Sequence, residues 1–137
     1  MKDSASNLPR KFLLPRSAIL RGREQIQQLF RIGKVYREQH LDVRFLLFPN
    51  DVTRFQVAFI AGKRLGKAHE RNAIRRRMKE AYRLHQHLLR ETAETRNTGF
   101  HGLFIAKKAG VPYAIIEQEC IRLLNRVCKT IGERDNS

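Results

Sequence analysis

Residues 62–90 read GKRLGKAHERNAIRRRMKEAYRLHQHLLR, and the rest of the chain is best interpreted outward from this stretch. It contains ten lysines and arginines against two acids, Glu70 and Glu80, and ten minus two leaves +8 of the +15 carried by the 137-residue chain. So much charge of one sign in a short segment indicates a polyanionic partner. The phosphate backbone of a nucleic acid fits that description best.

The same segment has the periodicity of one amphipathic helix over residues 68–90. At about 100° per residue, its apolar side contains Ile74, Met78, Ala81, Tyr82, His85, Leu88 and Leu89. The opposite side contains Asn72, Arg75, Arg76, Lys79, Arg83 and Arg90. Solvated helices usually interleave Glu with Lys, whereas these cations repel neighbours three and four residues away with almost no acid to relieve them. The segment therefore predicts a helix with one core-facing side and one side that binds a polyanion.

Shorter apolar patterns predict five further elements. Helices are expected over 23–32 and 113–131, and strands over 41–48, 54–61 and 100–106. Residues 49–51, Pro-Asn-Asp, have turn chemistry, so the first two strands are expected to pair as an antiparallel hairpin. The element order predicts an α+β fold, a small two-layer sandwich in which helices pack on a mainly antiparallel sheet.

The length of the chain suits one domain, expected over 21–131, with a flexible basic arm over 1–20 and a tail over 132–137. No apolar run approaches the ~20 residues of a membrane span, and the N-terminus lacks the hydrophobic segment of a signal peptide. A cytoplasmic protein without a membrane partner is therefore expected. No obligate protein partner is evident from the sequence.

No catalytic or metal-binding pattern occurs in the chain. The acids are scattered, and no P-loop, nucleophile elbow or H-E-x-x-H motif is present. Cys120 and Cys128 would lie ~12 Å apart along one helix, too far for a disulfide, and are expected to stay reduced. His85 falls on the apolar side of its helix and is expected to be packed. Any phosphodiester chemistry would then take its metal ions and acid–base groups from a partner.

Residues 58–83, AFIAGKRLGKAHERNAIRRRMKEAYR, resemble the signature segment of the bacterial ribonuclease P protein subunit family. That family has a Lys-Lys/Arg-x-Gly-x-Ala loop, then a helix that opens with Arg-Asn-Arg and continues Lys-Arg-x-x-Arg-Glu. The matching residues here are Lys63-Arg64, Gly66, Ala68, Arg71-Asn72, Arg75-Arg76 and Lys79-Glu80. Segments 20–34 and 102–111 are similar to the family's first helix and last strand, so the resemblance covers about residues 13–130.

Three positions depart from the family pattern. Ala73 stands at the second arginine of the Arg-Asn-Arg motif, and Lys79 stands at a later arginine. Ile26 replaces one of the two aromatics of the first helix, and Phe30 is the other. The bidentate contacts of a guanidinium are therefore lost at 73, and base stacking is lost at 26.

The resemblance implies a function for the chain. The family's protein binds a large catalytic RNA, and the two together remove the 5′ leader from precursor tRNA. The RNA supplies the active site and holds Mg²⁺, while a cleft between the protein's first helix and its sheet guides the single-stranded leader. The implied element order is α-β-β-β-α-β-α, with about four strands and a left-handed β-α-β crossover.

The resemblance also implies roles for individual residues. Contacts with the phosphates and riboses of the catalytic RNA are expected from Lys63, Arg64, Lys67, Arg71, Asn72, Arg75, Arg76, Lys79 and Arg83. Contacts with the precursor tRNA leader are expected from Phe30, Arg44, Phe48, Lys107 and Lys108, because aromatics beside cations suit single strands.

Two other classes of protein fit the composition. One is a small structural RNA-binding protein of ribosomal type, against which the ordered motif over 63–80 and its flanking matches favour the subunit. The other is a DNA-binding regulator with helix 68–90 in the major groove. Its recognition helix would offer varied base-reading side chains, whereas the cations here are nearly uniform.

Overall fold

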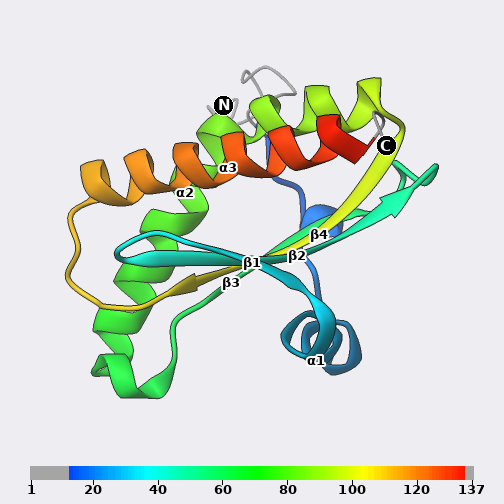
Figure 1. The fold of residues 1–137 in the computed structure, drawn as a ribbon. Coiled ribbons are helices and arrows are strands. Elements are labelled where there is room, and N and C mark those ends of the chain that lie inside the picture. Colours follow the sequence, from blue (N-terminus) through cyan, green and yellow to red (C-terminus); the bar gives the residue numbers. More distant parts are fainter. Residues whose placement is uncertain (1–12, 135–137) are drawn as a thin grey trace, which may run out of the picture.

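The computed structural model describes residues 13–134 and contains a four-stranded mixed sheet with helices on both faces (Figure 1). The strands are β1 (Lys34–Arg37), β2 (Leu41–Pro49), β3 (Phe55–Ile60) and β4 (Thr98–Ala106), in the spatial order β1-β2-β4-β3. The helices are α1 (Arg23–Ile32), α2 (Ala68–Thr95) and α3 (Tyr113–Arg134), with short 3-10 turns η3 (Arg16–Ala18) and η4 (Lys63–Leu65). The α+β class and the order α-β-β-β-α-β-α are confirmed.

The predicted hairpin between the strands over 41–48 and 54–61 is wrong, because β4 lies between β2 and β3. β2 pairs antiparallel with β4 along its whole length, and β3 pairs parallel with β4. Nearly every residue of β4 is buried, as expected of a central strand covered on both faces. A parallel β3–α2–β4 unit replaces the hairpin, and the left hand of this crossover stays a prediction.

Helices α2 and α3 pack together on one face of the sheet and enclose the main core. Its largest buried side chains include Phe45, Phe100, Phe104, Tyr82 and Leu123. Helix α1 lies on the opposite face, where Leu29 is buried in a second cluster with Ala58 and Leu103. The two-layer sandwich therefore carries a partial third layer, and α1 leaves a groove beside each of its flanks.

The folded unit begins earlier than the predicted boundary at residue 21. Ala18 and Leu20 are buried, and the Leu20 amide donates to the Val57 carbonyl at 2.7 Å, which places this segment along the edge of β3. The arm predicted over 1–20 is therefore wrong for residues 13–20, and residues 1–12 lie outside the described part. Helix α3 continues to Arg134, so residues 132–134 are helix rather than tail.

Cys120 and Cys128 lie on α3 as free thiols, which confirms that they do not bond to each other. Burial raises the pKa of the Cys120 thiol to about 12, so it stays protonated at neutral pH. His85 is half-buried with Nε2 2.8 Å from Glu117 Oε2, which confirms its predicted packing. Within residues 13–134, none of the helices has the length and apolar character needed to cross a membrane.

Replacing Gly99 by alanine should destabilise the fold. A Cβ at this position would lie 2.1 Å from the Asp51 carbonyl oxygen and 2.6 Å from the Arg54 carbonyl oxygen, because the β2–β3 connection crosses β4 at Gly99. Overpacking of this kind lowers the free energy of unfolding by about 1–3 kcal/mol, measurable by urea denaturation. Gly62→Ala is the control, since its added Cβ meets nothing within 4 Å. Equal stability of the two variants would contradict the tight crossing.

Candidate nucleic-acid interface

Glu70, one of the two acids of the basic segment, caps the first turn of α2, and among the described residues it forms no ion pair with the neighbouring cations. Glu70 Oε1 accepts a hydrogen bond from the Lys67 amide at 2.8 Å and so satisfies a free N–H at the helix N-terminus. Arg71 folds back onto the preceding loop, where its Nε donates to the Gly66 carbonyl at 3.2 Å. Three exposed cations surround this turn: Lys63, Arg64 and Lys67.

The side of α2 that faces away from the core carries cations without carboxylate partners. Arg75 Nη1 donates to Asn72 Oδ1 at 2.8 Å, which orients the guanidinium along the helix. Arg76 and Lys79 are exposed. Within residues 13–134, no carboxylate lies at ion-pair distance from Arg75, Arg76 or Lys79. We call Asn72, Arg75, Arg76 and Lys79 the basic face of α2.

Arg83, another member of the predicted RNA-binding set, is paired within the protein. Its Nε and Nη2 donate to the two carboxylate oxygens of Glu80 at 2.9 and 2.8 Å. The hydrogen bond from Arg83 is the main reason that the pKa of Glu80 is lowered. Glu80 therefore neutralises one cation of the segment. The prediction that these cations have almost no acid to relieve them did not account for this pair. Arg77 also lies off the basic face and donates from Nη1 to the Val111 carbonyl at 3.0 Å.

The parallel pairing of β3 and β4 gathers cations from two distant segments at one end of the sheet. Both strands end there, so η4 and the start of α2 follow β3, while Lys107 and Lys108 follow β4. Lys108 is exposed, whereas Lys107 Nζ lies 2.8 Å from Asp42 Oδ1 and donates to the Glu38 carbonyl at 2.6 Å. Lys108 therefore adds charge at this end of the sheet, while the charge of Lys107 is paired.

A groove of about 550 Å³ lies beside the basic face, and we call it the α2 groove. Its apolar lining includes Ile19, Leu20, Ile26, Ala58, Phe59 and Ile60. Its polar lining consists of the basic face together with Arg16 and Arg21 from the segment before α1. Apolar surface between cations matches a single strand, whose bases have apolar faces and whose phosphates are anionic.

Phe30 and Arg44 meet on the flank of α1 that also carries Ile26. Phe30 is 46% exposed to solvent, which is unusual for an aromatic residue. The Arg44 guanidinium carbon lies 5.2 Å from the ring centroid, and its Nη1 donates to the Phe30 carbonyl at 3.2 Å. At about 100° per residue, Ile26 and Phe30 share one flank of the helix, so this pair extends the surface of the α2 groove.

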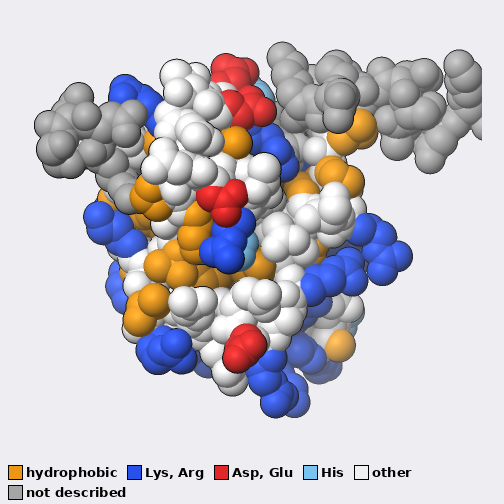
Figure 2. All heavy atoms as spheres, turned by 90° about the vertical axis from the view of Figure 1, so that its right-hand side faces the viewer, with side chains coloured by type: hydrophobic (Ala, Val, Ile, Leu, Met, Phe, Trp, Pro, Cys, Tyr) orange, Lys and Arg blue, Asp and Glu red, His pale blue; other side chains and the backbone are white. Residues whose placement is uncertain are grey.

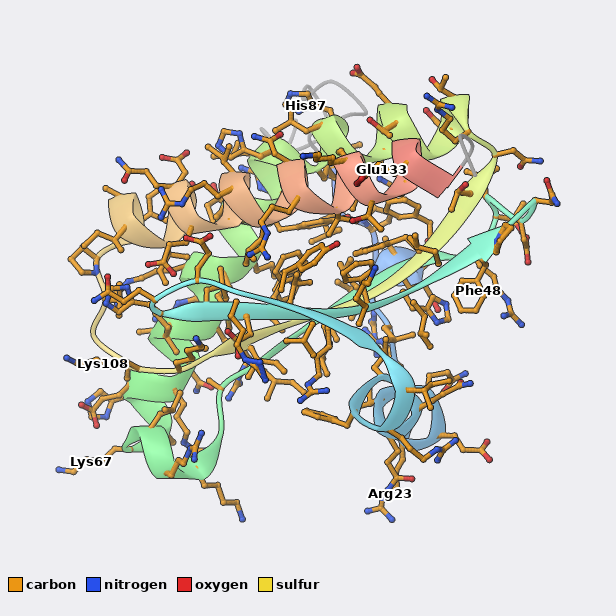
Figure 3. The ribbon with its side chains drawn as sticks, viewed as in Figure 1. Arg23, Phe48, Lys67, His87, Lys108 and Glu133 are labelled. Atoms are coloured by element: carbon orange, nitrogen blue, oxygen red, sulfur yellow. The ribbon has the colours of Figure 1, made fainter. Side chains whose placement is uncertain are left out.

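Phe48 does not join the other predicted leader residues. It lies seven residues from the Leu41 end of β2, so roughly 23 Å of strand separates it from the end that carries Lys107 and Lys108 (Figure 3). Its ring instead contacts the His101 ring at 4.8 Å between centroids and lies 4.6 Å from the Arg54 guanidinium carbon. The five predicted leader residues therefore occupy three separate places, and among these described residues the only hydrogen bond or ring contact between different elements joins Phe30 and Arg44.

Arg16 and Arg21 are functional candidates that the sequence interpretation missed. Pro15 and the scattered cations around it are typical of a flexible arm. The one contrary signal is the apolar run over 18–20, which is the part that packs on β3.

The fold and the basic face together define a basic α+β protein of the nucleic-acid-binding class. A family model described as Ribonuclease P matches residues 14–128, and the chain belongs to the ribonuclease P protein family. This membership favours the subunit over a ribosomal-type RNA-binding protein and over a DNA-binding regulator.

Relatives and solved structures agree with this family. The ribonuclease P protein component of Desulfovibrio desulfuricans is 29% identical over 124 residues, covering 88% of this chain and 90% of the relative. That of Chloroflexus aggregans is 31% identical over 112 residues, covering 80% and 76%. The RNase P proteins of Staphylococcus aureus and Thermotoga maritima align with TM-scores of 0.64 and 0.63 at 17% and 22% identity. These alignments cover 80% and 79% of this chain and 94% and 96% of the two structures, and at such identity they support the fold alone.

The stability of the protein should fall in mild acid partly because of His101. Burial, and next the nearby Arg54 charge, lower the pKa of this imidazole below its usual 6.5. The unfolded chain therefore binds more protons than the folded chain as the pH falls below about 6.5, so protonation favours unfolding. His101→Gln should show a smaller drop in thermal midpoint between about pH 7.5 and pH 5.5 than the unsubstituted chain. Identical drops would contradict the lowered pKa.

Proposed function

We propose that this chain is the protein subunit of ribonuclease P. It binds the catalytic RNA and the 5′ leader of precursor tRNA, and it promotes Mg²⁺-dependent removal of the leader in the cytoplasm. The observation that carries this proposal is the basic face of α2, which has no carboxylate partner among the described residues and belongs to a chain of this family.

The catalytic RNA binds the basic face and the cations around the start of α2. Arg75, Arg76 and Lys79 neutralise phosphates, and Asn72 adds a contact that depends on orientation because an amide both donates and accepts. Lys63, Arg64, Lys67 and Arg71 extend this surface along the preceding loop. Arg83 contributes less than these residues, because Glu80 already balances its charge.

The leader binds along the flank of α1 where Phe30 and Arg44 meet. An unpaired base stacks on the exposed Phe30 ring, and the Arg44 guanidinium beside it favours the anionic strand. The strand then continues along the apolar part of the α2 groove toward the basic face. This path brings the leader to the same side of the protein as the catalytic RNA.

The metal ions are held by the RNA. Within residues 13–134, no three His, Cys, Asp or Glu side chains are grouped so that they could hold a metal ion. Bound Mg²⁺ supplies the activated water and stabilises the leaving oxygen in phosphodiester hydrolysis. The chain's own part is electrostatic, because its cations reduce repulsion among the phosphates of the two RNAs. Its stimulation of cleavage should therefore be largest at low Mg²⁺.

Reconstitution tests this function directly. The purified chain is added at low Mg²⁺ to a bacterial ribonuclease P RNA, and cleavage of precursor tRNA is measured. We expect the chain to stimulate cleavage at the 5′ end of the mature tRNA, and the chain alone to give no cleavage. No stimulation at any Mg²⁺ concentration would refute the proposal.

The triple variant Arg75→Ala, Arg76→Ala and Lys79→Ala should bind the catalytic RNA roughly 100-fold more weakly. This estimate takes about 1 kcal/mol for each exposed charged contact. The measurement is a filter-binding Kd, with circular dichroism to confirm the fold. The matched control removes three exposed cations outside α2, in Arg23→Ala, Lys34→Ala and Lys129→Ala. Equal losses in the two triple variants would show that net charge, rather than the basic face, determines affinity.

Phe30→Ala should weaken binding of precursor tRNA to the reconstituted particle by about five-fold or more, the lower end of base stacking. Binding of mature tRNA, which has no leader, should not change. The measurement is the ratio of the two dissociation constants. An unchanged ratio in a folded variant would remove Phe30 from the leader path.

A further inference from the structure

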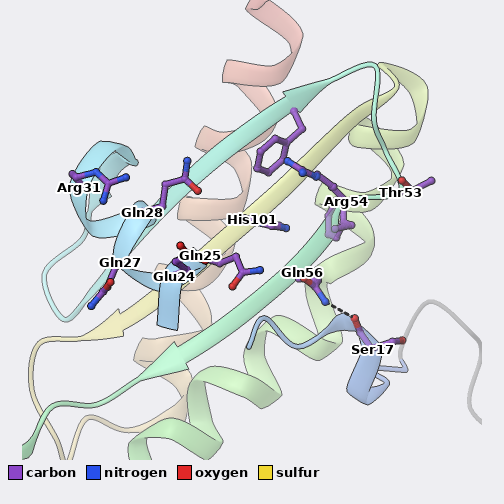
Figure 4. Close-up of a pocket in the computed structure, with 12 residues that line it drawn as sticks. Ser17, Glu24, Gln25, Gln27, Gln28, Arg31, Thr53, Arg54, Gln56 and His101 are labelled. Carbon is purple, nitrogen blue, oxygen red and sulfur yellow. Dashed lines mark hydrogen bonds between the residues drawn. The ribbon is translucent and has the colours of Figure 1, made fainter. Parts of the chain in front are cut away.

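A second groove, of about 830 Å³, lies on the other flank of α1, against the end of the sheet where β3 begins (Figure 4). We call it the α1 groove. At about 100° per residue, Gln28 and Phe30 project to opposite sides of the buried Leu29, so the α1 groove and the proposed leader path lie on different flanks of the helix. The α1 and α2 grooves share no lining residue. The proposed leader path follows the other flank of α1, so it leaves the α1 groove without a ligand, although Phe48 from the predicted leader set lines this groove.

At the wall of this groove, the guanidinium of Arg54 is held in place by its neighbours and forms a flat platform. Its backbone is fixed because its carbonyl accepts from the Phe100 amide at 2.7 Å and Gly99 lets the connection pass close to β4. Its guanidinium lies over the Phe48 ring at 4.6 Å and 3.6 Å from an Asp51 carboxylate oxygen. The side chain is nevertheless 57% exposed, so the guanidinium remains accessible from the groove. A guanidinium plane supported in this way is a surface on which a nucleobase stacks.

Amide groups line the groove around this platform. Gln25 reaches from α1 toward Gln56 and His101 on the sheet (Figure 4). Gln56 Nε2 donates to the Ser17 carbonyl at 3.0 Å, which fixes its orientation. Gln28 is exposed and makes no hydrogen bond to another described residue, so its amide is free to meet a ligand. Side-chain amides pair with the donor and acceptor edges of bases, whereas phosphates need donors alone.

The charge of the α1 groove differs from that of the basic face. Its lining contains two cations, Arg31 and Arg54, and one acid, Glu24. Figure 2 looks onto this side of the molecule, where most Lys and Arg side chains lie toward the edges and hydrophobic atoms surround the centre. A surface that only neutralised a phosphate backbone would carry more cations and fewer amides.

We propose that the α1 groove binds one unpaired RNA nucleotide, with its base against Arg54 and its base edge in contact with the glutamine amides. Arg31 at the rim attracts the phosphate of the same nucleotide. That the ligand is RNA rests on the proposed function, and the groove gives the protein a second contact on the opposite flank of α1 from the leader path.

The test separates base stacking from charge. Dissociation constants of a fluorescent uridine hexanucleotide and of an abasic RNA hexamer are measured by anisotropy with the full chain, Arg54→Ala and Arg37→Ala. Arg37 is the matched control, because it is 59% exposed and lies 3.9 Å from the Asp42 carboxylate, much as Arg54 pairs with Asp51. We expect Arg54→Ala to weaken binding of the uridine hexanucleotide by about five-fold or more. Its effect on the dissociation constant of the abasic hexamer should be no larger than that of Arg37→Ala. Equal effects of both variants on both oligomers would overturn the proposal.

A second variant tests the proposal independently, in case the Arg54→Ala substitution impairs folding. Gln28→Ala removes an exposed amide from a helix and should reduce affinity for the uridine hexanucleotide about two-fold or more, whereas Gln118→Ala, an exposed glutamine on α3, should not. If Gln28→Ala and Gln118→Ala behave alike, the amides do not read a base and the proposal is overturned.

Crosslinking identifies the source of the nucleotide. Gln28→Cys carrying an aryl azide is assembled with the catalytic RNA and precursor tRNA, and the wild-type chain treated in parallel gives the background from Cys128. A crosslink to an unpaired nucleotide of either RNA supports the proposal and shows which RNA supplies it. No crosslink above background, or crosslinks to paired regions alone, overturns it. Cleavage measured on the same particles reports the proposed function separately, since cleavage can persist when the α1 groove is empty.

Discussion

The structure depends on α2 holding mutually repelling cations on one side while its other side is locked into the core. Ile74, Met78, Tyr82 and Leu89 are all buried on that inner side. Burying each such side chain contributes about 1.5–3 kcal/mol, whereas each like-charge pair on a helix surface costs about 0.2–0.5 kcal/mol. Apolar burial therefore outweighs the repulsion several times over. Among the described residues, the cations of the basic face stay in place without carboxylates to neutralise them, and Arg83 alone on this side pairs with Glu80.

Sheet topology determines which groups share a surface with this helix. Because β3 and β4 are parallel neighbours, the loop before α2 and the residues after β4 emerge at one end of the sheet. The segment before α1 lies along the edge of β3 and brings Arg16 and Arg21 to the α2 groove. The interface is thus assembled from four parts of the chain, although most of its charge lies on one helix.

Local patterns predict most elements of this fold, but they do not predict which strands are neighbours. The helices over 23–32, 68–90 and 113–131 were recognisable because each has its own apolar periodicity. The first has the predicted bounds, and the other two continue to Thr95 and Arg134. The pairing of β2 with β4 joins residues between 49 (Pro49 with Thr98) and 65 (Leu41 with Ala106) positions apart, and the turn at 49–51 favoured a hairpin instead. β1, with four residues, is too short to show alternation and was missed by pattern.

The residues of the candidate site likewise fall into those that local spacing predicts and those that depend on sheet topology. The basic face was predictable because its cations lie on one helix, where spacing alone gives the direction of each side chain. The pairing of Arg83 with Glu80 was also readable, since the two lie three residues apart. The pairing of Lys107 with Asp42 was not, because it depends on the register of β2 against β4. The separation of Phe48 from Phe30 was not readable either, because Phe48 lies beside the flank of α1 opposite to the one that carries Phe30.

The salt dependence of binding to the catalytic RNA tests the central claim most directly. If the basic face neutralises phosphates, the logarithm of the affinity should fall linearly with the logarithm of salt concentration. Each neutralised phosphate contributes a slope of about −0.7 to −0.9, so Arg75, Arg76 and Lys79 alone predict a slope steeper than about −2. An affinity that hardly changes with salt would contradict the account, because the outward cations of α2 would then have no part in binding.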